Sequence, residues 1–288
     1  MVGTEPVFIA SMSSSETDRK LNTLYLESYG VRVRIESNNK RLFNDARRQT
    51  EHALVGNFRI IDPVETPHVF RLEREEGGYS QVKNGEKSGV NKSRKVLLRY
   101  FDSMLRITIA EYAVGHVFLH AGVVGWKGRA IVIPGDSYSG KSTLVAELVK
   151  AGAEYYSDEY AVLDERGLVY PFARRLSMRT EPGKGKSIDN IYITAEELGG
   201  RVGSTGIAVG WVLVTTFENN AQWNPKVLSS GKGVLEMLSQ TIPIRYAPEF
   251  SLKVLKTVAT HAIILKSPRF DASAFAKFFL DFVDNKAF

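Results

Sequence analysis

The feature that most constrains this chain is a glycine-rich octapeptide at residues 135–142, which reads GDSYSGKS. It follows a short apolar run, 129–134, that predicts a buried strand, and it precedes a run with helical apolar periodicity, 143–152. A strand, a glycine-rich turn and a helix start form an anion site, because the loop N–H groups and the positive end of the helix dipole converge. The sequence therefore predicts a phosphate-binding loop within an α/β fold.

Each residue of this loop has an expected place around a nucleotide. Lys141 would reach the β- and γ-phosphates, and the Ser142 hydroxyl would hold Mg²⁺. The predicted cofactors are therefore ATP and Mg²⁺. We expect the nucleotide to contact the whole loop and the residue that follows it: Gly135, Asp136, Ser137, Tyr138, Ser139, Gly140, Lys141, Ser142 and Thr143.

Two adjacent carboxylates follow the loop. Asp158 and Glu159 lie 23 and 24 residues after Gly135, near the start of the next strand region at 153–163. Phosphoryl transfer needs a metal site and a group that orients or deprotonates the attacking hydroxyl. Because neighbouring strand residues point to opposite faces, we assign Asp158 to the hydroxyl and Glu159 to the metal. The alternative is a solvated acidic pair at the end of a strand.

Composition restricts the class of protein. The 288 residues include no cysteine, which excludes disulfides, thiolate zinc sites and cysteine nucleophiles and fits a cytoplasmic protein. No apolar run approaches the roughly 20 residues of a membrane span, and the N-terminus lacks a secretory pattern. The formal charge of +6 favours anionic partners. Nucleic acid is not expected among them, because no aromatic platform motif accompanies the basic residues.

The chain divides into two expected parts, residues 1–95 and 96–288. Alternating apolar and charged residues between 21 and 82 predict strands of a small α/β region, with a short helix at 45–54. A stretch rich in glycine and lysine, 76–95, indicates the boundary. A long helix is predicted over 96–119 from the four-residue spacing of Leu97, Phe101, Leu105 and Ile109.

The second part contains most of the predicted α/β pattern. Strands at 121–126 and 130–133 flank a tight turn, and a buried strand is expected at 210–217. Helices are predicted at 234–238, 252–260 and 272–283, with a last strand at 261–265. The glycine-rich stretch 183–206 predicts a mobile surface segment that closes over the nucleotide. Arg201 within it is a candidate for reaching the transferred phosphate.

The order and spacing of these motifs resemble HPr kinase/phosphorylase, the bacterial serine kinase that acts on the phosphocarrier HPr. His120 stands 15 residues before Gly135, the loop begins Gly-Asp-Ser, and Ser157-Asp158-Glu159 follows it. The resemblance covers about residues 115–180. It implies a P-loop core akin to phosphoenolpyruvate carboxykinase, with a mixed sheet flanked by helices. The small N-terminal α/β region would be an addition to it.

The resemblance also implies roles. Asp158 would be the base with His120 beside it, Lys141 would clamp the phosphates, and Ser142 with Glu159 would hold Mg²⁺. Arg179 or Arg201 would neutralise charge on the transferred group, and the family's assembly implies a homo-oligomer.

Departures from the family pattern indicate that the chain resembles the wider group of HPr-kinase-like proteins. Glu159 replaces the second Asp of the family's acidic pair, and Ser177 replaces a Glu. The chain therefore looks like a divergent member, such as the kinases that phosphorylate a serine of a peptide precursor.

The leading hypothesis is an ATP- and Mg²⁺-dependent kinase that phosphorylates a serine hydroxyl of a protein or peptide. Two alternatives remain open. One is a kinase of a small-molecule hydroxyl, and the other is a catalytically inactive nucleotide-binding regulatory protein.

Overall fold

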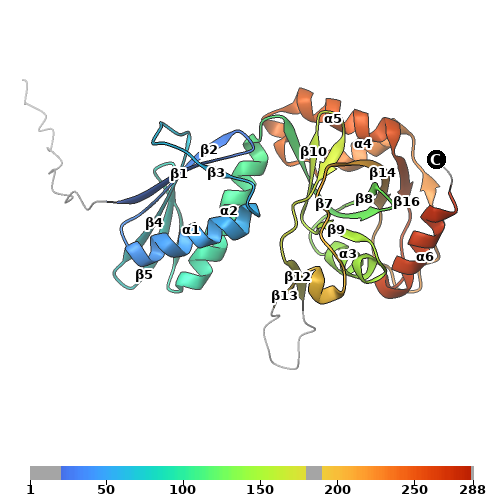
Figure 1. The fold of residues 1–288 in the computed structure, drawn as a ribbon, viewed down its shortest axis with the longest axis horizontal. Coiled ribbons are helices and arrows are strands. Elements are labelled where there is room, and N and C mark those ends of the chain that lie inside the picture. The colour runs from blue at the N-terminus through green and yellow to red at the C-terminus, as the bar shows by residue number, and fades with distance from the viewer. Residues whose placement is uncertain (1–20, 180–189, 287–288) are drawn as a thin grey trace, which may run out of the picture.

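A computed structural model describes residues 21–179 and 190–286. Two sheets, each with its own helices, lie side by side along the long axis of the molecule (Figure 1). The first sheet has six strands in the order β3-β1-β2-β4-β5-β6. Their bounds are β1 Asn22–Ser28, β2 Val31–Ser37, β3 Arg59–Ile60, β4 His68–Glu75, β5 Gly78–Lys83 and β6 Glu86–Asn91.

Two helices pack on this first sheet. Helix α1 (Lys40–Leu54) begins where the Asn39 side chain accepts a hydrogen bond from the Leu42 amide, which satisfies one of the free N–H groups of the first turn. Helix α2 (Arg94–Tyr112) lies beside it and places Leu97, Phe101 and Leu105 in the core. The predicted helix at 45–54 is thus present and begins five residues earlier.

The second sheet is mixed and holds the glycine-rich loop. Its order is β11-β10-β7-β8-β14-β16-β15, with β9 paired to β7. Strands β8, β14 and β16 are parallel, and β7 pairs with β8 in the antiparallel sense. The bounds are β7 His116–Trp126, β8 Arg129–Pro134, β9 Glu154–Ser157, β10 Tyr160–Asp164, β11 Leu168–Tyr170, β14 Ile207–Val214, β15 Lys226–Val227 and β16 Ile263–Lys266.

Helices cover both faces of this sheet. One face packs against α3 (Lys141–Lys150) and α6 (Ala272–Asp284), around buried Trp211 and Leu213 of β14. The other packs against α4 (Ser230–Leu238) and α5 (Pro248–His261), around Val132 and Val212. The predicted α/β class with a mixed sheet flanked by helices is therefore confirmed. Smaller elements are β12 Leu176–Arg179, β13 Asn190–Ile193 and the 3₁₀ turns η1 Glu196–Leu198 and η2 Ile242–Arg245.

The predicted helix over 96–119 is wrong in its last part. Helix α2 ends at Tyr112, Gly115 adopts a left-handed φ of 72°, and strand β7 starts at His116. Residues 117–119 are apolar and fully buried, because β7 is covered on both faces. A short continuous apolar run fits a buried helix and a doubly buried strand equally well, and only its tertiary neighbours decide. His120 therefore lies within a strand.

Helix α2 joins the two parts of the chain that we expected to divide at residues 95 and 96. It packs against α1, β5 and β6 of the first sheet, and also against η2 and β7. The first core includes Phe118 of β7 and Tyr160 of β10. By its packing, α2 belongs with the first sheet and forms the junction to the second.

The glycine-rich segment 183–206 lies only partly within the described residues. Residues 180–189 fall outside them, and two glycines of the remainder lie close to buried side chains. A Cβ at Gly200 would lie 2.3 Å from Val149, and one at Gly203 would lie 2.0 Å from Tyr156. These two glycines allow close packing against α3 and β9, and the mobility expected of the segment stays a prediction. Among the helices of the described residues, none is long and apolar enough to cross a membrane.

Candidate functional site

The glycine-rich loop lies at the edge of the sheet where its parallel strands end. It connects the end of β8 to the start of α3, and the ends of β14 and β16 lie at the same edge. In open α/β sheets, ligands bind in the crevice outside the carboxyl ends of the strands. The predicted strand, loop and helix are therefore present in the predicted order.

Gly140 occupies a position that only glycine fits. Its φ is 84°, and a Cβ there would lie 2.6 Å from Nη2 of Arg269. That nitrogen donates a hydrogen bond to the Gly140 carbonyl at 3.1 Å. Arg269 is 2% exposed, and its hydrogen bond connects the segment after β16 to the loop.

Lys141 is enclosed by its own loop. Its Nζ donates hydrogen bonds to the carbonyls of Gly135 at 2.6 Å and Asp136 at 2.7 Å. The residue is 8% exposed. Burial lowers the pKa of Lys141 to about 8, although the carboxylates of Asp136 and Asp158 oppose the shift. The loop thus presents a concentrated, poorly hydrated positive charge.

A pocket of about 360 Å³ brings most of the predicted site together. Lys141, Ser142, Asp158 and His120 all contribute to its wall, although they come from the loop, helix α3, the β9–β10 turn and β7. The pairing of Tyr160 with His120 in the β10–β7 ladder positions the turn. The full lining is His120, Ser137, Tyr138, Gly140, Lys141, Ser142, Thr143, Asp158, Ser177 and Met178.

The carboxylate of Asp158 has two hydrogen-bonding neighbours. The Tyr155 hydroxyl, whose proton is shared with the Arg174 carbonyl at 2.8 Å, lies 2.9 Å from Oδ1, and the Ser177 amide donates to Oδ2 at 3.3 Å. Burial, followed by the charge of Asp158, raises the pKa of Tyr155 well above its ordinary value, so the phenol keeps its proton. These bonds fix the orientation of Asp158 within the pocket.

His120 is an uncharged neighbour of the loop. Burial and the nearby Lys141 lower the pKa of its imidazole, while a hydrogen bond with Gln240 opposes the shift. The His120 amide donates to the Gln240 carbonyl at 2.8 Å, and the Gln240 side chain donates to Asp136 at 2.9 Å. Gln240 therefore links His120 to the loop, a link that no sequence pattern indicated.

Glu159 has a different setting from the expected one. One of its oxygens is paired with Arg106, and the other accepts from Arg174 at 2.9 Å. Both arginines also bind Asp102 of α2. Glu159 is absent from the pocket wall, and its carboxylate is directed at these two arginines instead. The carboxylate expected in the metal shell thus belongs to an ion-pair network.

The structure describes the two candidate arginines to different extents. Arg179 ends β12 opposite Asn190, and its side chain lies outside the described residues, so its role stays a prediction. The Arg201 side chain is 80% exposed and pairs with Glu154 at 2.8 Å.

The donor set of the pocket fits Mg²⁺. The Ser142 hydroxyl is a hard oxygen ligand, and Mg²⁺ in nucleotide sites takes few protein groups and completes its shell with phosphates and water. Within the described residues, no group of three or more His, Cys, Asp or Glu could hold a metal by itself.

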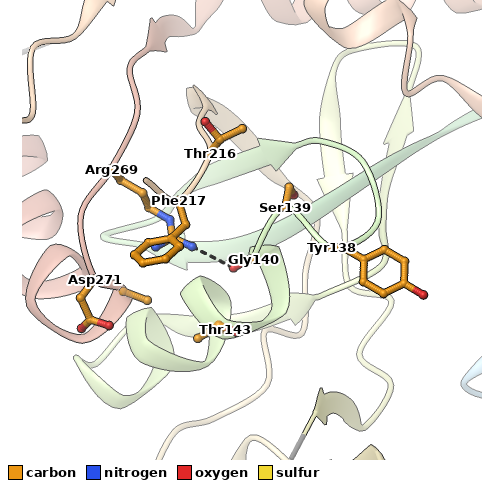
Figure 2. Close-up of a pocket in the computed structure, with 9 residues that line it drawn as sticks. Tyr138, Ser139, Gly140, Thr143, Thr216, Phe217, Arg269 and Asp271 are labelled. Atoms are coloured by element: carbon orange, nitrogen blue, oxygen red, sulfur yellow. Dashed lines mark hydrogen bonds between the residues drawn. The ribbon is translucent and has the colours of Figure 1, made fainter. Parts of the chain in front are cut away.

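A second pocket of about 460 Å³, drawn in Figure 2, shares Tyr138, Gly140 and Thr143 with the first. Sequence reasoning missed its main residues, Phe217 and Arg269, which follow β14 and β16. Their position just after two buried strands was the available signal, but only the parallel arrangement brings both to the loop. No protein-family model matches this chain, and no curated protein matches its sequence.

Proposed function

We propose that this chain is an ATP- and Mg²⁺-dependent kinase of the HPr kinase-like type, built on a P-loop core. It would transfer the γ-phosphoryl group to a serine hydroxyl of a protein or peptide in the cytoplasm. One observation carries the proposal: Lys141, Ser142, Asp158 and His120 line one pocket at the carboxyl edge of parallel strands. A phosphate clamp, a metal ligand and a base are the parts that phosphoryl transfer needs.

The loop would bind the phosphates. Its amides and the N-terminus of α3 favour negative charge, and Lys141 would exchange its two carbonyl partners for phosphate oxygens. Mg²⁺, when bound, would supply neutralisation of the phosphate charge. Ser142 would hold it, with the remaining ligands from phosphates and water. Glu159 would not, because two arginines already occupy its oxygens.

Asp158 would accept the proton of the attacking hydroxyl. The serine oxygen forms a bond to the γ-phosphorus, the bond from that phosphorus to the β,γ-bridging oxygen breaks, and ADP leaves. Tyr155 and the Ser177 amide keep the carboxylate aimed during the transfer. His120, neutral because of its lowered pKa, adds no positive charge to the pocket that would make the Asp158 carboxylate less basic.

The acceptor would approach from the β12–β13 hairpin. Ser177 and Met178 of β12 line the pocket beside Asp158. The paired strand β13 presents Ile191 and Tyr192, which are 50% and 45% exposed. Exposed apolar residues next to the base suit a peptide chain better than a small polar metabolite.

The second candidate is a nucleotide-binding protein without transfer activity. The engagement of Glu159 with Arg106 and Arg174 favours it, because it removes one carboxylate from the expected metal shell. Binding of ATP·Mg²⁺ is common to both candidates, and only phosphoryl transfer separates them.

The test uses the purified full chain. Calorimetry should show ATP·Mg²⁺ binding, and an array of serine peptides with alanine-matched partners should gain labelled γ-phosphate only at serine. Nucleotide binding without labelling of any peptide or added protein would support the inactive candidate. Absence of ATP·Mg²⁺ binding would overturn both.

A further inference from the structure

The second pocket has no part in the transfer chemistry described above. The segments after three parallel strands form it: the loop after β8, Thr216 and Phe217 after β14, and Arg269, Asp271 and Ala272 after β16. Figure 2 shows Phe217 and Arg269 side by side, with Arg269 bonded to Gly140, while Tyr138 points away from them. Its volume of about 460 Å³ lies within the range of small-ligand sites.

The loop gives a direction to any bound nucleotide. Lys141 and Ser142, which handle the β- and γ-phosphates, line only the pocket that contains Asp158. Gly140 and Thr143 line both pockets. A triphosphate whose γ-phosphorus faces Asp158 therefore runs back past Thr143, and its other end enters the second pocket.

Phe217 provides a flat apolar surface in that pocket. Its side chain is 53% exposed, although a phenyl ring is normally buried. The Arg269 guanidinium lies 5.7 Å from the ring centroid and holds one side of it. Arg269 is itself fixed by the carbonyls of Gly140 and Phe270, each at 3.1 Å. The ring is thus a supported platform.

We infer that the second pocket receives the nucleoside of the nucleotide, with the base stacked on Phe217. The Asp271 carboxylate, at the start of α6, supplies an acceptor for the ribose hydroxyls. Stacking accepts any base, because every base has a π-face. This inference rests on the proposed function, since it assigns the other end of the same nucleotide.

The test compares ATP·Mg²⁺ with tripolyphosphate·Mg²⁺, which carries the phosphates alone. In calorimetry, wild type should bind ATP more tightly than tripolyphosphate. Phe217→Ala should weaken ATP binding by about 5- to 150-fold, the range expected for losing one base–aromatic stack, and leave tripolyphosphate binding unchanged. Phe217→Trp should retain tight ATP binding.

Tyr246→Ala is the matched control, because it removes an exposed ring that lines neither pocket. It should change neither affinity. Unchanged tripolyphosphate binding also shows that Phe217→Ala is folded. Equal loss of both ligands in Phe217→Ala, or no loss of ATP binding, would overturn the nucleoside assignment. If wild type bound neither ligand, the proposed function would fail instead.

Discussion

At the scale of single residues, Gly140 shows why the loop needs its second glycine. Gly140→Ala would place a Cβ 2.6 Å from Arg269 and force a left-handed φ on alanine. Such strain costs on the order of 1–3 kcal/mol, and moving Arg269 would release the loop. We expect lower stability in urea unfolding and weaker ATP·Mg²⁺ binding.

Gly231→Ala is the control for that substitution. Gly231 lies in helix α4, and nothing stands within 4 Å of its added Cβ. Alanine should there stabilise the protein by about 0.5–1 kcal/mol. A Gly140→Ala protein as stable as wild type would show that the loop does not depend on this contact.

The buried charge of Lys141 should lower the free energy of unfolding of this protein. The Lys141 pKa of about 8 is below the ordinary value of 10.5, so burying the charge opposes folding below pH 8. That penalty disappears as pH rises from about 8 to 10.5. Lys141→Met should therefore raise the melting temperature at pH 7, with a smaller gain at pH 10, while abolishing ATP·Mg²⁺ binding.

Lys150→Met, at an exposed site on the same helix, should leave nucleotide binding intact. A lower melting temperature for Lys141→Met at pH 7 would instead mean that the two carbonyl hydrogen bonds outweigh the cost of burial.

The same titration predicts how nucleotide affinity depends on pH. Binding of the phosphates requires that Lys141 be charged. In the protein without nucleotide, Lys141 loses its proton above about pH 8. Binding should therefore weaken by about tenfold per unit of pH above that value. Calorimetry of ATP·Mg²⁺ from pH 7 to 9.5 checks this. A flat profile would show that Lys141 does not contact the nucleotide.

Asp158→Asn separates binding from chemistry. The amide has nearly the same shape but cannot take up a proton, so phosphoryl transfer should fall by about 100- to 10,000-fold. ATP·Mg²⁺ should still bind. Asp281→Asn, an exposed site on α6, should keep full activity and controls for the lost charge. Full transfer activity in Asp158→Asn would place the base elsewhere.

At the scale of elements, strand direction assembles the site. Because β8, β14 and β16 are parallel, their following segments meet at one edge and form the second pocket. Because β7 is antiparallel to β8 and pairs with β9 and β10, the β9–β10 turn reaches the loop from the other side. The loop thus lies between a parallel half and an antiparallel half of the sheet.

At the scale of the whole molecule, an ion-pair network connects the two sheets. Asp102 of α2 lies 3.1 Å from Arg174 and 2.8 Å from Arg106, and both arginines reach Glu159 beside Asp158. Asp102 and Arg106 are almost fully buried. The N-terminal helix pair is thereby joined to the turn that carries the proposed base.

Removing one carboxylate from this network should be costly. Asp102→Asn would leave two poorly hydrated arginines with only Glu159, and breaking a buried pair costs about 3–5 kcal/mol. Urea unfolding should measure that loss. Glu165→Gln, which removes an exposed pair with Lys253, should change stability by less than about 1 kcal/mol. Equal effects of the two substitutions would show that the network is not stabilising.

The sequence by itself determined the local parts of this protein. Short-range sterics and apolar periodicity are enough to predict the strand 129–134, the glycine-rich turn and the helix after it, and all three are present. The same holds for helices α4, α5 and α6 and for the β7–β8 turn, where Lys127 and Gly128 adopt left-handed φ values. Asp158 could be chosen from its place in the strand region after the loop, and His120 only from the family resemblance.

Only the tertiary structure decided which distant side chains meet. Arg269 is 129 residues from its partner Gly140, and Arg106 is 53 residues from Glu159. Nothing local distinguishes these arginines from the many others, because each pairing depends on strand order and on the burial it creates. The end of α2 was decided in the same way, since β7 became a strand when helices and the sheet covered both of its faces.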